Sequence, residues 1–180
     1  MNVKTEKSQL KLSWLERLIG GPIRVNLFAV AKSIFVTERS EEMAGLIARI
    51  THRKGQIFVA DQIFNWRNIS DTEDLRITAD VSGNQTILEI RANYSTMAFF
   101  IFFAVFFSGM FLTAAIGGFA FQPKTGVGIG TIAISGFIIS YLISRMIWGN
   151  FAEKRINELR MLIECLCDFV DENPNVQEHR

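Results

Sequence analysis

The stretch that decides the fold is MAFFIFFAVFFSGMFLTAAIGGFAF, residues Met97 to Phe121, which carries no charged side chain. A second apolar stretch, Val127 to Trp148, follows closely and contains a single charge, Arg145. A helix needs about 20 apolar residues to cross ~30 Å of hydrocarbon, and both stretches reach that length. We therefore predict two transmembrane helices, 97–121 and 127–148, joined by a short turn at 122–126. A hairpin buried in a soluble core is disfavoured, because buried helices seldom run so long without charge.

The distribution of basic residues predicts the orientation of this hairpin. The chain before Met97 holds 13 Lys and Arg residues, and four more follow Trp148, whereas the turn holds only Lys124. Basic residues near the ends of a span favour the cytoplasmic side. We expect both termini in the cytoplasm and only the turn outside.

Small residues recur at helical spacing on both spans and allow two backbones to approach closely in lipid. The predicted helix-packing interface comprises Gly109, Thr113, Gly117, Gly130 and Gly136. In an antiparallel hairpin, Gly117 is expected near Gly130 and Gly109 near Gly136. Packing between two copies of the chain is the alternative. Neither span contains Asp, Glu or His, the groups that ion and proton pathways use, so an oligomeric pore or transporter component ranks third among the functions.

Residues 23–94 alternate polar and apolar segments in the manner of a small cytoplasmic α+β domain. We predict a strand over Val25 to Thr37 and another over Ile57 to Phe64. Strict alternation predicts two more strands, Leu75 to Val81 and Thr86 to Ala92, joined by a turn at Ser82-Gly83-Asn84.

A helix is predicted between the first two of these strands, over Ser40 to Lys54. Ser40 is the expected N-cap, Arg49 and its basic neighbours load the last turn, and Gly55 is expected to end the helix. The fold class is therefore a membrane α-helical hairpin, a small antiparallel sheet with one or two helices, and a C-terminal amphipathic helix.

The segments at the two ends are both predicted to contain amphipathic helices. In residues 1–22, a helix over Ser8 to Ile19 either lies in the lipid interface or docks on the domain. In residues 149–180, apolar residues recur at heptad spacing, which predicts a seam for the chain's own domain, a second copy or another protein. The seam residues are Ile156, Leu159, Ile163, Leu166 and Val170.

Few residue patterns point to chemistry. Net charge is +1, which gives no nucleic-acid footprint. Cys165 and Cys167 are two apart on a predicted helix and form a poor metal pair. We expect no catalytic residues, no metal and no cofactor. One possible contact for anionic lipid headgroups remains, with scattered solvated charge as the alternative. It comprises Arg49, Arg53, Lys54 and Arg67.

The run from Ile57 to Arg91 combines an aromatic strand ending in Phe64-Asn65-Trp66-Arg67, an alternating strand, a Gly-Asn turn and the segment Thr86 to Ile90. With the two-span hairpin and the charged helix behind it, this pattern resembles a loose group of uncharacterised bacterial membrane proteins that carry a small α/β domain before the hairpin. The resemblance implies a bacterial inner membrane and brings no activity with it.

These patterns lead to one principal hypothesis. The chain is expected to be a non-enzymatic, membrane-anchored scaffold, regulatory or accessory protein. Its expected partners are membrane lipid and either a second copy or another membrane protein. The alternative is a lipid-binding or small-molecule-binding module at the cytoplasmic face of the membrane.

Overall fold

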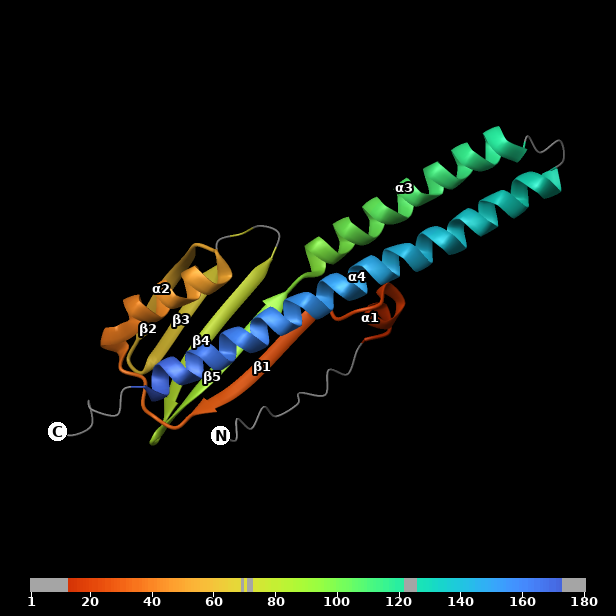
Figure 1. Ribbon diagram of the computed structural model, residues 1–180. Helices are drawn as coiled ribbons and strands as arrows, with labels where there is room; N and C mark the ends of the chain where they lie inside the picture. The colour runs from red at the N-terminus through yellow and green to blue at the C-terminus, as the bar shows by residue number, and fades with distance from the viewer. Residues whose placement is uncertain (1–12, 69, 71–72, 122–125, 173–180) are drawn as a thin grey trace. The chain divides into compact units, whose positions relative to one another are not determined.

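The computed structural model describes residues 13–68, 70, 73–121 and 126–172 (Figure 1). These residues divide into two compact units. The sheet unit contains residues 24–94 together with the chain from Lys154 onward. The described part of the hairpin unit contains residues 13–23 and the segment Ser95–Glu153.

The sheet unit is built on five antiparallel strands in the order β1-β5-β4-β3-β2. The strands are β1 (Arg24–Ala31), β2 (Gly55–Ala60), β3 (Ile63–Asn68), β4 (Asp74–Ser82) and β5 (Gln85–Asn93). Successive side chains of a strand point to opposite faces, so the alternation read in the sequence becomes an inner and an outer face. Leu75, Ile77 and Ala79 of β4 are fully buried on the inner face.

Two strand predictions need correction. The segment Ile57 to Phe64 is not one strand, because the chain reverses at Asp61, whose φ is +49°, and forms the hairpin β2–β3. The continuous apolar run Ile57 to Ala60 concealed this turn, since neither Asp61 nor Gln62 is a strong turn signal. The first strand ends at Ala31 rather than at Thr37, which instead opens the 3₁₀ turn η1 (Thr37–Arg39).

The helix α2 spans Ser40–Thr51, and both of its ends differ from expectation. Ser40 is already helical, because η1 leads directly into α2 and leaves Arg39 at the N-cap, where its side chain makes no capping hydrogen bond. At the other end, His52 adopts a left-handed conformation with φ +54° and terminates the helix. Gly55 therefore begins β2 instead of ending α2.

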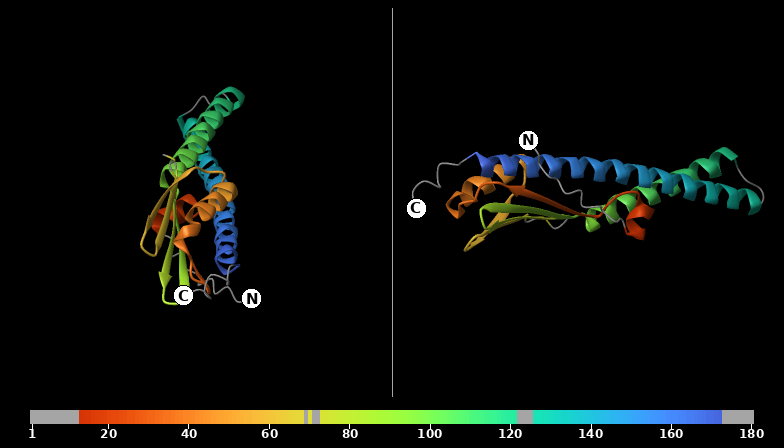
Figure 2. Two further views of the ribbon diagram at one scale, coloured as in Figure 1. Left: turned by 90° about the vertical axis from the view of Figure 1, so that its left-hand side faces the viewer. Right: turned by 90° about the horizontal axis from the view of Figure 1, so that it is seen from below.

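Two helical segments cover the inner face of the sheet, and the views of the sheet unit agree on this (Figures 1 and 2). One is α2, whose buried residues are Met43, Ala44 and Ile47. The other is the last part of α4 (Gly126–Asp171), which buries Leu162, Ile163 and Leu166. The core of the unit thus lies between the inner face and these two helices, the two-layer arrangement that a sheet with one apolar face requires.

The end of α4 is fastened to the loop after β1. The Asp171 carboxylate accepts hydrogen bonds from the backbone N–H groups of Lys32 (2.8 Å) and Ser33 (3.0 Å). The guanidinium of Arg39 lies 4.0 Å from the ring centroid of Phe169 and donates to the Phe169 carbonyl. These contacts anchor the helix beside β1 in addition to its apolar burial.

The hairpin unit contains α3 (Ser95–Phe121) and the first part of α4, two helices long and apolar enough to cross a membrane. A Cβ added to Gly109 would lie 2.6 Å from Ser140 Oγ, and one added to Gly136 would lie 2.9 Å from Thr113. Gly117 likewise approaches Ile132. The antiparallel register thus sets Gly109 opposite Ser140 and Gly117 opposite Ile132. The expected neighbours were Gly136 and Gly130. Gly130 itself has open space at its Cβ position.

The second predicted span and the C-terminal helix form one element, since α4 continues without interruption through Gly149. At the other junction, Tyr94 alone separates the last residue of β5 from the first residue of α3. No linker segment therefore separates the sheet-unit sequence from either apolar helix.

The helix α1 (Trp14–Ile19) docks on α4 within the hairpin unit. The Tyr141 hydroxyl donates to the carbonyl of Leu18 (2.7 Å), and the Trp148 indole N–H donates to the carbonyl of Gly21 (3.3 Å). Trp148 is fully buried beside the α1 segment. Trp14, on the same helix, stays exposed. The predicted start of this helix at Ser8 lies outside the described residues.

Two glycines of the sheet unit provide a stability test with opposite signs. A Cβ at Gly55 would collide with the indole ring of buried Trp66, whereas one at Gly45, in the middle of α2, meets nothing within 4 Å. Gly55→Ala is expected to destabilise the sheet by about 1–3 kcal/mol through overpacking. Gly45→Ala is expected to stabilise α2 by about 0.5–1 kcal/mol. Hydrogen exchange of sheet and α2 amides in the full chain measures both; equal effects of the two substitutions would contradict the packing of Trp66 against Gly55.

Candidate functional site

The four basic residues predicted to contact lipid headgroups are not brought together. Arg53 forms an ion pair with Glu73 at the start of the chain segment that leads into β4. Arg67 lies on the outer face of the sheet, where its Nε is 3.0 Å from Asp74 Oδ1. Arg49 and Lys54 are exposed at and beyond the end of α2, the helix that covers the inner face.

A buried ionic cluster occupies the place where α2 ends and β4 begins. Glu73 and Arg53 form its central ion pair, with side chains that are 4% and 17% exposed respectively. Tyr94 is buried beside them. Its burial, reinforced by the negative charge of Glu73, raises the pKa of the Tyr94 phenol well above its ordinary value. Tyr94 therefore stays neutral throughout the physiological range and presents a hydroxyl rather than a phenolate.

A cavity of about 290 Å³ lies next to this cluster. Its apolar wall includes Leu159 and Leu162 of α4, and its polar groups include Arg155 and Glu158, which form an ion pair 2.6 Å apart. Since both arginines beside the cavity already have carboxylate partners, the arrangement acts chiefly as a structural fastening between α2, β4, the end of β5 and α4.

The predicted partner seam of the C-terminal helix lies mostly inside the chain. Leu159, Ile163, Leu166 and Val170 are buried, and Ile156 is half-buried. Among the three occupants that the sequence left open, the structure seats the chain's own sheet unit against these side chains. A surface for another molecule has to lie elsewhere.

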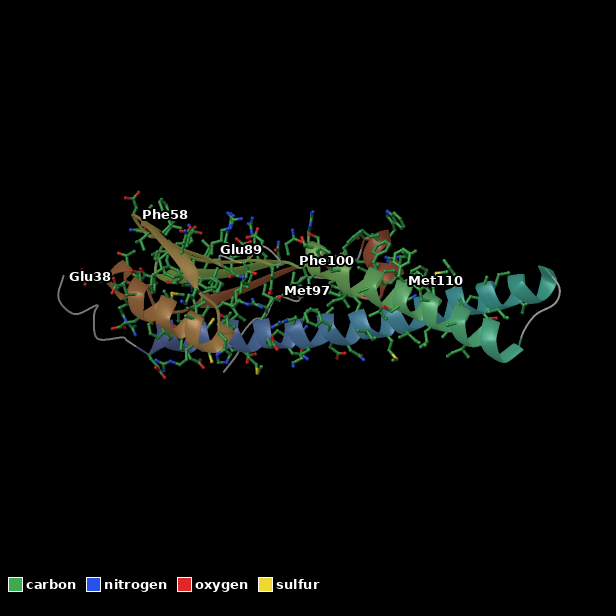
Figure 3. All side chains as sticks on the ribbon, turned by 90° about the horizontal axis from the view of Figure 1, so that it is seen from above. Glu38, Phe58, Glu89, Met97, Phe100 and Met110 are labelled. Carbon is green, nitrogen blue, oxygen red and sulfur yellow. The ribbon has the colours of Figure 1, made fainter. Side chains whose placement is uncertain are left out.

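The outer face of the sheet is the large surface that no described helix of the sheet unit covers. Side chains project from it, as Phe58 and Glu89 illustrate in Figure 3, and the strand register sets them in rows that run across the strands. The row nearest the β4–β5 turn is largely apolar, with Val30 opposite Ile87. The next row runs from Phe28 through Glu89 and Thr78 to Asn65 and Phe58.

The following row, two residues before the end of β5, is basic. Arg91 of β5 stands opposite Arg76 of β4, and Arg76 stands opposite Arg67 of β3. We call these three residues the arginine row. A hollow of about 230 Å³ lies at its β1 side and is lined by Arg24, Arg76 and Arg91 together with Asn26, Asp74 and Asn93.

Sequence reasoning found only Arg67 of this row. The polar positions of the alternating strands did carry the signal, since Arg76 and Arg91 fall where outward-facing residues are expected. What was missing is the register, which decides whether outward residues of different strands are neighbours.

Comparison with protein-family models, with curated proteins and with solved structures finds no match to this chain. The resemblance to bacterial two-span membrane proteins therefore stays a prediction.

The ion pair of Glu73 tests the importance of the buried cluster. Glu73→Gln leaves the guanidinium of Arg53 without its buried carboxylate, so it is expected to cost about 3 kcal/mol of sheet-unit stability. Asp74→Asn, the matched control, breaks a pair whose side chains are 46% and 59% exposed and should cost less than about 1 kcal/mol. Hydrogen exchange of the β3–β5 amides measures both. Similar small losses for the two variants would show that the cluster contributes little.

Proposed function

We propose that this chain is a two-pass protein of the bacterial inner membrane that acts without catalysis, as a scaffold, regulatory or accessory subunit. The hairpin anchors it, and the sheet unit lies in the cytoplasm with the segments on both sides of the hairpin. The partner is a second copy of the chain or another membrane protein, bound through the outer face of the sheet.

The observation that carries this proposal is the amount of apolar surface left uncovered on both units. Only 6% of the most apolar stretch of α3 is buried within the chain, which is far less than the core helix of a soluble protein would show. Phe111 and Ile134 are examples of large side chains that point away from the protein. Lipid is the solvent that such an all-round apolar surface requires.

The sheet unit leaves apolar side chains uncovered as well. Phe28, Val30 and Ile87 project from the outer face near β1, and Phe58 projects from it at the β2 edge. Exposed apolar residues that gather on one face favour a protein interface. The absence of charged residues from α3, in contrast, speaks against an ion pathway through the hairpin.

The orientation can be tested with the natural cysteines. Cys165 is exposed on α4 in the sheet unit, whereas burial raises the pKa of the Cys167 thiol to about 11 and keeps it in the unreactive protonated form. A membrane-impermeant maleimide at neutral pH should therefore leave intact spheroplasts unlabelled and add one label after permeabilisation. Cys165→Ser should abolish that label. As the matched control, Thr125→Cys in a chain without the two natural cysteines should react in intact cells; labelling of Cys165 from outside would overturn the orientation.

The accessory role predicts a defined complex. Extraction from native membranes in lipid particles, followed by mass measurement, should give the chain with a stoichiometric protein partner or as a defined oligomer. Val30→Ser combined with Ile87→Ser should dissociate that complex, because the two side chains are cross-strand neighbours on the outer face. The control Gln56→Ser alters an exposed polar residue of β2 and should leave it intact. A monomer that carries only lipid would refute the accessory role.

A further inference from the structure

The arginine row places three like charges directly opposite one another on adjacent strands. Directly paired residues on one face of an antiparallel sheet have Cβ atoms about 5 Å apart, and like charges in such pairs repel. Arg76 stands in the middle and meets this repulsion from both sides. This repulsion lowers the stability of the folded sheet, and a bound anion would relieve it.

Two carboxylates of the sheet neutralise the two ends of the row and leave its centre charged. Glu89 binds Arg91 through two hydrogen bonds of 2.5 and 2.9 Å, and Asp74 binds Arg67 at 3.0 Å. The side chain of Arg76 has neither a hydrogen bond nor an ion pair with any residue in the described part of the chain. Its exposed guanidinium lines the hollow that Arg24 and Arg91 also line.

The hollow therefore suits an oxyanion. A guanidinium presents N–H donors in a planar fork that matches the geometry of phosphate oxygens. Asn26, which lines the same hollow, carries an amide group that can donate a further hydrogen bond. The one carboxylate that lines the hollow, Asp74, is paired with Arg67, so the guanidinium of Arg76 stays available to an external anion.

Chain connectivity decides which oxyanion is within reach. Arg91 precedes Ser95, the first residue of α3, by four positions. At a rise of ~3.3 Å per strand residue, at most about 13 Å of backbone separates Arg91, the β5 member of the row, from the start of the apolar helix. The headgroup layer extends roughly 5–7 Å beyond the hydrocarbon, and charges act over a Debye length of about 8 Å at physiological ionic strength. The row is thus within electrostatic range of lipid phosphates whenever α3 spans a membrane.

We propose that the arginine row, with Arg24, binds the phosphate of anionic phospholipid headgroups, with Arg76 as the central contact. This inference rests on the membrane insertion of α3 in the proposed function and names the lipid class that the sheet unit recognises. It also gives the outer face two zones: a basic one for lipid near the end of β5, and an apolar one for the protein partner nearer the β4–β5 turn.

The test uses the full chain in micelles of a neutral detergent, titrated with phosphatidylglycerol or phosphatidylcholine and examined by native mass spectrometry. The wild-type chain should retain phosphatidylglycerol in preference to phosphatidylcholine. Arg76→Gln should weaken phosphatidylglycerol binding about fivefold, the contribution of one basic residue near an anionic surface. Arg49→Gln is the matched control, because it removes the same charge from an exposed position on α2.

A second readout separates binding from folding. Without lipid, Arg76→Gln should leave the midpoint temperature of thermal unfolding unchanged or raise it, since the substitution removes two repulsive cross-strand pairs. A large fall in the midpoint would show that Arg76 is structural and would overturn the proposal. Equal lipid binding by Arg76→Gln and Arg49→Gln would overturn it too, because net charge alone would then explain the affinity.

Inorganic phosphate provides the last arm of the experiment. Millimolar phosphate should not displace phosphatidylglycerol from the wild-type chain; displacement would make the hollow a site for a soluble phosphate compound and refute the lipid assignment. The micelle measurement requires neither the cytoplasmic orientation nor a protein partner. Failure of the lipid site is therefore distinguishable from failure of the proposed function. Cysteine labelling tests the orientation, and native extraction tests the protein partner.

Discussion

The constraint on which the rest of the structure depends is that one uninterrupted helix, α4, changes its surroundings along its length. Its first part is apolar on all sides and packs against α3 through close contacts such as Gly136 with Thr113. Its last part carries charged residues on one side and buries Leu162, Ile163 and Leu166 on the other. A single continuous helix therefore has a surface apolar enough to cross a membrane at one end and contributes to a protein core at the other. No helix break separates the two parts, so both belong to one continuous run of helical turns.

The sequence predicted the parts of this arrangement that depend on composition and period. A charge-free run such as Met97 to Phe121 has few alternatives as a structure. The strict alternation from Leu75 to Val81 likewise determined which residues of β4 are buried. Predictions failed where a local signal was weak. The reversal at Asp61 lacks glycine and proline, and the continuity of α4 past Gly149 overrode the intrinsic tendency of glycine to weaken a helix.

The candidate site was the least predictable feature because it depends on register. Arg67, Arg76 and Arg91 are separated in the sequence by a hairpin and an irregular loop, and each looks like an ordinary outward residue of its own strand. A shift of one residue in either pairing would send one of these side chains to the opposite face and separate the row. The same argument explains why the basic turn after α2 looked more promising than it is. Arg53 forms an ion pair with Glu73 and is therefore not available to a lipid headgroup. The composition of the turn does not reveal a buried carboxylate that is distant in the sequence.

The two ionic arrangements of the sheet unit differ in a way that bears on function. In the buried cluster, each arginine has a carboxylate partner, and the charges contribute to holding elements together. In the arginine row, three arginines face two carboxylates, Asp74 and Glu89, and the central guanidinium, that of Arg76, is exposed and unpaired among the described residues. Charge that stabilises a fold is normally balanced within the fold, whereas charge retained against mutual repulsion is typical of a surface that binds an external anion. The imbalance, rather than the number of arginines, is what distinguishes the outer face as a recognition surface and the cluster as a fastening.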